Sequence, residues 1–148
     1  MDCSSPPVLF FDGDCAMCNR GVGFIANRIP DDVELMFASL NSAAGQHLLT
    51  MFPLARSRDA LVLLHKGEIV QGALAVATVL ELLPRWAILG RWLRLVPERA
   101  RESAYDLVAR SRHGLARPSV SCRMPGPRVQ ARLSSQALGC ESAHLGIA

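Results

Sequence analysis

The sequence is poor in aromatic residues, in lysine and in long apolar runs, and these shortages argue against several classes of protein. Aromatic residues make up only 5% of the 148 residues, and the arginines behind the net charge of +3 are scattered among apolar residues. A nucleic-acid surface needs clustered basic residues with aromatic side chains that stack on bases, so we expect no nucleic-acid partner. The most apolar helical stretch, residues 73–83, is shorter than the roughly 20 residues that cross a bilayer.

Cysteine is also too sparse for a disulfide framework or a zinc site. The chain has five cysteines, of which only Cys15 and Cys18 are closely spaced. The odd number and wide spread do not match a secreted disulfide framework, and no apolar signal segment precedes Arg20. We therefore expect a cytoplasmic protein. Structural zinc takes four ligands, so the pair would have to recruit Cys122, Cys140 or a histidine, and we expect no bound metal or cofactor.

The segment VLFFDGDCAMCNRGVGFIANRI, residues 8–29, predicts a strand, a turn and a helix. Its first four residues are β-branched, apolar or aromatic and stop at Asp12-Gly13, which is typical of a buried strand that enters a turn. A helix should begin near Asp14, whose carboxylate can cap the first amide groups, and end before Pro30. One apolar stripe runs down this helix: Cys18, Val22, Ile25 and Ile29. Both cysteines are therefore expected in its first turn.

This placement makes Cys15 and Cys18 the candidate catalytic residues. The unpaired amides and the positive end of the helix dipole stabilise a thiolate, which is the nucleophilic form of cysteine. Two cysteines at this spacing can close a small disulfide ring, so one can attack a substrate disulfide and the other can resolve the mixed intermediate. We expect Cys15 to attack and Cys18, on the buried stripe, to resolve. Asp12 and Asp14 oppose a nearby negative charge, but they can hold the turn or carry protons.

The same turn also resembles the nucleophile loop of haloacid-dehalogenase-type phosphatases, in which a strand precedes Asp-x-Asp. Those enzymes need Ser or Thr two residues after the second aspartate, where this chain has Ala16. They also need a downstream lysine and a late acidic pair. The only lysine is Lys66, and the pair Asp31-Asp32 comes early in the chain. A phosphatase that uses Asp12 and Asp14 is thus the weaker alternative.

The remaining pattern predicts a small mixed sheet with flanking helices. In order, we expect a strand at 33–38, a helix capped by Asn41 or Ser42 through Thr50, strands at 60–64 and 68–70, and helices at 73–83, 86–96 and 97–111. The first two strands should be parallel neighbours in a β-α-β unit, and the next two should form an antiparallel hairpin. The expected inward residues of the short helix are Leu48, Leu49 and Met51.

The last helices differ in their predicted packing. Helix 73–83 has only Thr78 and Glu81 as polar residues, so it should be buried or should meet a partner. Helix 86–96 combines tryptophan and arginine in a way that suits a membrane surface, but we expect its apolar side to pack on the core. The expected inner face of helix 97–111 consists of Ala100, Ala104, Leu107 and Val108. We expect residues 1–7 to be flexible, residues 8–117 to form the domain and residues 118–148 to form an irregular, largely mobile tail.

These motifs resemble the DCC family of predicted thiol-disulfide oxidoreductases, also described as a domain of unknown function. The resemblance covers about residues 8–133. It rests on FDGDCAMC at residues 11–18, with support from FASLNSAAGQ at 37–46 and LVPERARESAYDLVAR at 95–110. It implies a thioredoxin-like α/β fold and a Cys15/Cys18 dithiol without a bound cofactor. Thioredoxin-like enzymes carry a cis-proline directly before the third strand, whereas Pro53 lies further upstream here.

Our main hypothesis is a protein-disulfide oxidoreductase that uses Cys15 and Cys18. Its partners would be a disulfide-bearing or thiol-bearing protein or small molecule and an unidentified electron donor. The alternative is a non-catalytic binding or membrane-surface module in which the cysteines pack as small apolar residues. Chemical reactivity of Cys15 separates these hypotheses, because only the first requires an accessible thiolate.

Overall fold

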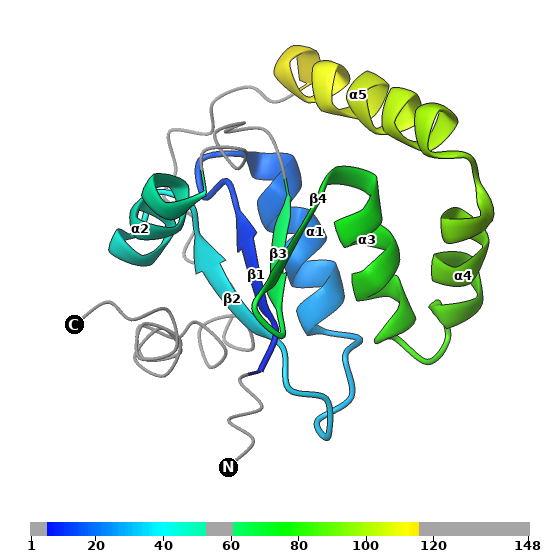
Figure 1. The fold of residues 1–148 in the computed structure, drawn as a ribbon, viewed down its shortest axis with the longest axis horizontal. Coiled ribbons are helices and arrows are strands. Elements are labelled where there is room, and N and C mark those ends of the chain that lie inside the picture. The colour runs from blue at the N-terminus through cyan, green and yellow to red at the C-terminus, as the bar shows by residue number, and fades with distance from the viewer. Residues whose placement is uncertain (1–5, 53–60, 116–148) are drawn as a thin grey trace.

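A computed structural model describes residues 6–52 and 61–115, which form a four-stranded sheet and five helices (Figure 1). The strands are β1 (Val8–Phe11), β2 (Met36–Ser39), β3 (Val62–His65) and β4 (Glu68–Gln71). The helices are α1 (Ala16–Ala26), α2 (Ala43–Met51), α3 (Gly72–Glu81), α4 (Ala87–Leu95) and α5 (Glu98–Leu115).

The order of strands across the sheet is β2-β1-β3-β4. Strand β1 is parallel to β2 and antiparallel to β3, and β3 forms an antiparallel hairpin with β4. Both strand pairings predicted from the sequence are therefore confirmed, and the arrangement is that of a thioredoxin-like α/β fold. Strand β2 begins later than expected, at Met36, because Met36 pairs with Val8 at the start of β1 and the ladder is no longer than β1 itself.

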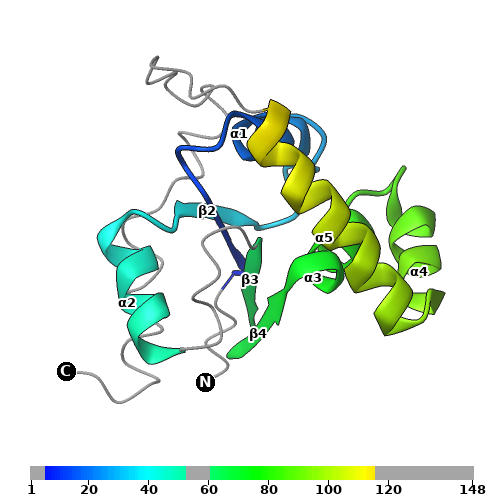
Figure 2. The same cartoon turned by 90° about the horizontal axis from the view of Figure 1, so that it is seen from above.

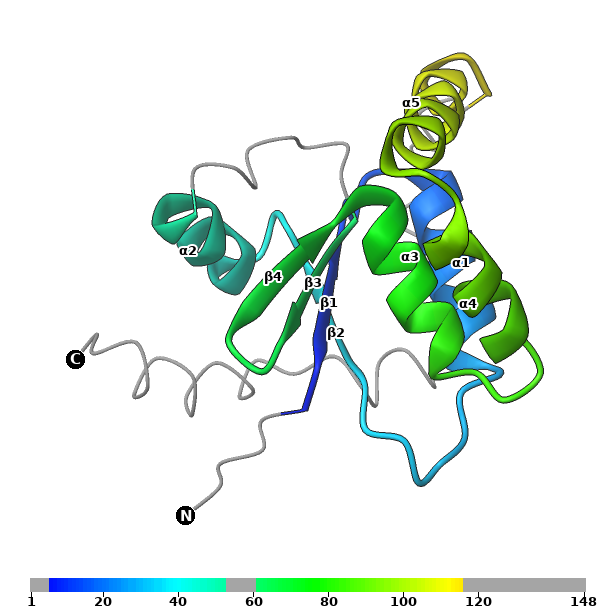
Figure 3. The ribbon, with the colours of Figure 1, turned by 45° about the vertical axis from the view of Figure 1, so that its right-hand side comes forward.

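Strand β1 is buried on both faces, which explains why all four of its residues are apolar. Successive side chains of a strand point to opposite faces. Leu9 and Phe11 join a core cluster with residues of α1 and α3, whereas Val8 and Phe10 join a second cluster that includes Leu48 of α2. Figure 3 shows the same division, with α1 and α3 on one side of the sheet and α2 on the other.

Helix α3 is buried as predicted, and the short helix α2 is oriented only partly as predicted. Ala75, Ala77 and Val79 of α3 are almost inaccessible to solvent. In α2, Leu48 is buried, but Met51 is 38% exposed, so its predicted inward position is wrong. Met51 is the last residue of α2, and the residue after it, Phe52, packs against the core cluster instead.

The prediction that helix 86–96 packs its apolar side on the core is wrong. Ile88 and Trp92 of α4 are exposed, and the side that faces α3 carries Gly90 and Arg94 instead. The physical reason lies in α3, which presents the Ala77 carbonyl oxygen and the side chains of Thr78 and Glu81 to α4. These small and polar groups suit a glycine and an arginine better than bulky apolar side chains.

The predicted inner face of the last helix is also wrong. Ala100 and Ala104 are exposed, as are Leu107 and Val108 at 71% and 48%, and the side chains that point inward belong to Arg101, Glu102 and Tyr105. The Tyr105 hydroxyl accepts a hydrogen bond from the Leu61 backbone N–H at 3.0 Å. Glu102 lies against Gly72, which has a φ of +61° that favours glycine.

Helix α5 thus packs on backbone at the start of β3 and the end of β4, where polar side chains can meet peptide groups. Figure 2 shows α5 running over the end of the molecule at which α1 begins. Within the described ranges, no helix is both long and apolar enough to span a membrane. The predictions for residues 1–5 and 118–148, and the position of Pro53, fall outside the described residues.

Candidate functional site

Cys15 lies directly before α1, at the carboxyl end of β1. It is the N-cap residue of α1, with extended backbone angles, and its Sγ accepts a hydrogen bond from the Cys18 backbone N–H at 3.3 Å. The expectation that Asp14 caps this helix is therefore wrong. The cap position falls one residue later, and the sulfur of Cys15 takes the place of a capping oxygen. The two cysteines are close together as a result.

The turn before α1 is held by hydrogen bonds from its own residues. Asp12 Oδ1 accepts from the Asp14 N–H at 3.0 Å, and the Asp12 carbonyl accepts from the Cys15 N–H at 3.3 Å. From the first turn of α1, the Asn19 side-chain amide donates to the Gly13 carbonyl at 2.8 Å. These contacts fix the backbone that carries Cys15, because peptide groups on both sides of it are tied down.

A second loop, between β2 and α2, supports the turn from outside. The Asn41 side-chain amide donates to Asp14 Oδ2 at 2.8 Å, and the Asn41 N–H donates to Ser39 Oγ at 3.2 Å. A Cβ on Gly13 would lie 2.7 Å from the same Ser39 Oγ, so the two loops approach closely. Because β1 and β2 are parallel, their carboxyl ends share one edge of the sheet, where open α/β folds place their sites.

The environments of the two sulfurs suit different roles. Both cysteines are half-buried thiols. Cys18 packs against the core cluster that contains Leu9 and Phe11, as its place on the predicted stripe indicates. Met17, between them, is 43% exposed. The site is therefore open to solvent on its outer side and backed by the core on its inner side.

No cluster of three or more potential metal-ligating side chains occurs within residues 6–52 and 61–115. The other cysteines of the chain, Cys3, Cys122 and Cys140, lie outside those ranges. His47 is exposed, as expected. His65 ends β3 opposite Glu68, at the sheet edge away from the cysteines, and its buried Nδ1 has no hydrogen-bond partner in the described part of the chain.

Sequence reasoning singled out Asp12, Asp14, Cys15 and Cys18, but it missed the contacts that Asn19 and Asn41 make with their turn. Asn41 was considered only as a helix cap, and that role belongs to Ser42, whose Oγ accepts from the Gly45 N–H at 3.2 Å. The parallel pairing of the first two strands was a usable signal, because it places the residues after each strand side by side. For Asn19, no such signal exists in the sequence.

Comparison with known proteins identifies one family and two relatives that this chain is similar to. A family model described as DCC1-like thiol-disulfide oxidoreductase matches residues 9–118. The chain is 32% identical over 127 residues to the uncharacterized protein YuxK of Bacillus subtilis, covering 84% of this chain and 91% of that protein. It is 28% identical over 122 residues to the chloroplastic DCC family protein At1g52590 of Arabidopsis thaliana, covering 80% and 69% of the two chains. No solved structure matches the chain.

Proposed function

Because this chain belongs to the DCC1-like thiol-disulfide oxidoreductase family, we propose that Cys15 and Cys18 form a redox dithiol. The dithiol exchanges electrons with a protein or small molecule that carries a disulfide or a thiol pair. The observation that carries the proposal is the position of both cysteines in one helical turn, with the Cys18 amide on the Cys15 sulfur. We therefore prefer redox chemistry to the phosphatase alternative.

In the reducing direction, the Cys15 thiolate attacks one sulfur of a substrate disulfide. A mixed disulfide forms, and the other substrate sulfur leaves as a thiolate and takes up a proton. Cys18, once deprotonated, attacks the Cys15 sulfur, which closes the Cys15–Cys18 disulfide and releases the second substrate thiol. Two electrons pass to the substrate, and a dithiol donor then restores the reduced pair. The reverse sequence oxidises a substrate dithiol.

The surroundings of the sulfurs support this division of roles. An N–H directed at Cys15 Sγ favours negative charge on that sulfur, and the start of the helix adds the positive end of its dipole. Cys18 packs on the core, so it is better placed to meet a sulfur already bound to Cys15 than a substrate arriving from solvent. The proposed roles are thus nucleophile for Cys15 and resolving thiol for Cys18.

Asp12 and Asp14 are proposed to act through the backbone. Each carboxylate accepts a hydrogen bond that holds the turn, one from the Asp14 N–H and one from Asn41. These hydrogen bonds hold each carboxylate in one orientation. The carboxylate therefore cannot turn toward Cys15, where it would repel a thiolate. We propose that the protein works in a reducing compartment such as the cytoplasm, where a dithiol is regenerated after each cycle.

Trapping of the mixed disulfide tests the proposal. In a background that lacks the other three cysteines, Cys18→Ser should accumulate a covalent adduct with oxidised insulin, because the resolving step is blocked. Cys15→Ser should form none. Intact protein should catalyse insulin reduction by a dithiol, and either serine variant should abolish this activity. The reduction potential of the Cys15/Cys18 pair then gives the direction of electron transfer. A value of about −270 mV indicates a reductant, and a value of about −120 mV indicates an oxidant.

The dithiol proposal fails if Cys15 alkylates no faster than a model thiol and Cys15→Ser keeps the insulin-reduction activity. The cysteines would then pack as small apolar side chains, and the chain would be a binding module. Circular dichroism of each variant shows whether a lost activity reflects lost fold.

A further inference from the structure

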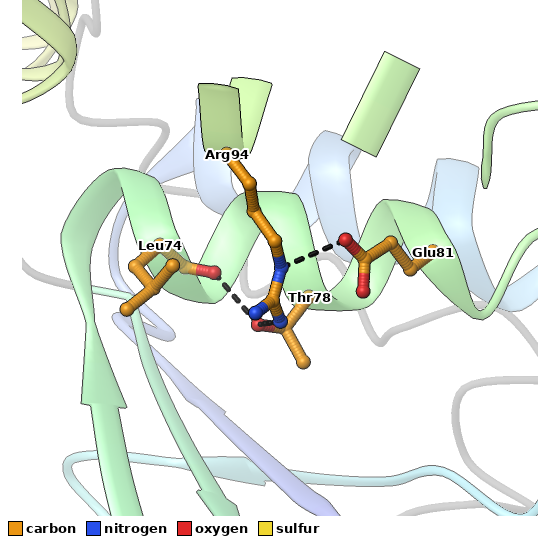
Figure 4. A network of polar contacts seen from close by, with 4 residues as sticks. All are labelled: Leu74, Thr78, Glu81 and Arg94. Atoms are coloured by element: carbon orange, nitrogen blue, oxygen red, sulfur yellow. Dashed lines mark hydrogen bonds and ion pairs between the residues drawn. The ribbon is translucent and has the colours of Figure 1, made fainter. Parts of the chain in front are cut away.

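Helix α4 packs on α3 through the side that carries Gly90 and Arg94. Gly90 is buried against α3, where a Cβ would lie 2.6 Å from the Ala77 carbonyl oxygen and 2.8 Å from Glu81 Cγ. Arg94 reaches across to α3, with its Nε 2.7 Å from Glu81 Oε1 and its Nη2 3.0 Å from Thr78 Oγ1 (Figure 4). Thr78 in turn donates to the Leu74 carbonyl. The helix is therefore held by close backbone packing and an ion pair.

The opposite side of α4 is an outward apolar stripe, formed by Ile88, Trp92 and Leu95. Their spacing of four and three residues places them on one face of a helix. They are 67%, 65% and 75% exposed, and Leu89 beside them is 49% exposed. Large apolar side chains that stay in contact with water on one continuous face mark an interaction surface.

The charged side chains on α4 and in the segment directly before it are all arginines. Between Glu81 and Glu98 the chain carries three arginines and no lysine, aspartate or glutamate. Arg94 is neutralised by Glu81, whereas Arg85 and Arg91 are exposed and have no ion pair with a described carboxylate. The surface of α4 thus combines exposed apolar groups with uncompensated positive charge.

We propose that α4 docks on an anionic membrane surface, with the outward apolar stripe in the headgroup region and Arg85 and Arg91 on lipid phosphates. An amphipathic helix with tryptophan and leucine on one face and arginine at its border has this mode of binding. The helix lies in the plane of the surface and does not cross it. Figures 1 and 2 show α4 outside α3 and on the opposite side of the molecule from α2.

Charge favours a membrane over a second copy of this chain. A twofold dimer pairs a patch with itself, so the uncompensated arginines of one copy would approach those of the other. Anionic lipid instead supplies the opposite charge, and each arginine near such a surface strengthens binding about fivefold. The proposal is independent of the redox chemistry, and Cys15→Ser should bind vesicles as tightly as the intact protein.

Vesicle flotation with the full chain tests the proposal. We expect binding to vesicles of phosphatidylcholine mixed with phosphatidylglycerol, little binding to pure phosphatidylcholine, and loss of binding in high salt. Arg91→Gln should weaken binding about fivefold, and Leu95→Ala should weaken it by about fivefold or more. Tryptophan fluorescence should shift to the blue with anionic vesicles, and it should not shift in Trp92→Phe, which keeps only the half-buried Trp86.

Leu107→Ala is the matched control, because Leu107 is nearly as exposed as Leu95, at 71% against 75%, but lies on α5. Its binding should be unchanged. The proposal is overturned if anionic vesicles do not retain the intact protein, or if Leu107→Ala weakens binding as much as Leu95→Ala. It is also overturned if sedimentation shows a dimer that Leu95→Glu dissociates, because the stripe would then bind a second copy.

Discussion

Replacement of Gly45 by alanine should loosen the support of the cysteine site. Gly45 lies in the first turn of α2, and its N–H donates to the capping Ser42. An added Cβ would lie 2.4 Å from Leu40 Cα and 2.5 Å from each of the carbonyl oxygens of Leu40 and Ser39. All three atoms belong to the backbone, so no side-chain rotation can relieve the contact, and α2 or the loop before it has to move.

Two effects of opposite sign determine the size of the change. Alanine in a helix is favoured over glycine by up to about 1 kcal/mol. Overpacking in a tight site costs about 1–3 kcal/mol, and the movement also disturbs the burial of Leu48 against the sheet. Steric strain therefore outweighs helix propensity, and we expect a net loss of about 1–2 kcal/mol. For a chain of this length that lowers the melting temperature by about 3–6 °C.

Gly21→Ala is the matched control, because Gly21 lies in α1 and a Cβ there would meet nothing within 4 Å. This variant should gain stability, by up to about 1 kcal/mol. Thermal and urea unfolding of both variants measure the difference, and the rate of Cys15 alkylation reports any displacement of Asn41. If Gly45→Ala is as stable as the intact protein, α2 does not pack as closely on the backbone of Ser39 and Leu40 as the structure shows.

Three further substitutions test individual contacts. Asn41→Ala removes the hydrogen bond to Asp14 and should cost about 1 kcal/mol in urea unfolding; adding Asp14→Ala to it should cost little more, and an additive loss would contradict the contact. Tyr105→Phe leaves the Leu61 N–H without its acceptor, so we expect a loss of about 1–2 kcal/mol, and an unchanged melting curve would argue against the docking of α5. Gly72→Ala forces a side chain into a positive φ at a cost of about 1–2 kcal/mol, and thermal unfolding should detect it.

Local pattern was sufficient for the elements and for the position of the cysteines. Three signals each extend over only a few residues: the short apolar run before Asp12, the periodic stripe that starts at Cys18, and the short gap between the strands expected at 60–64 and 68–70. For this reason the strand pairings and the buried helix α3 are confirmed. The cap of α1 was missed by one residue, because both Asp14 and Cys15 carry an atom that can accept from the first turn.

The sequence did not predict which face of α4 or α5 packs against the rest of the protein. Helices α4 and α5 both have an apolar side, and the sequence predicted that this side faces inward. In the structure, α4 meets a small and polar face of α3, and α5 meets peptide groups beside β3 and β4, so polar side chains turn inward on both. A helix pattern records which residues share a face, but the surface across from it decides which face is buried.

The sequence by itself determined the strand, turn and helix that bring Cys15 and Cys18 into one helical turn, because hydrogen bonding and periodicity act over a few residues. The tertiary structure alone decided that Asn41 reaches Asp14 and that Ile88, Trp92 and Leu95 remain exposed. Both outcomes depend on contacts between segments that lie far apart in the chain, and no local pattern contains the shape or charge of the distant partner.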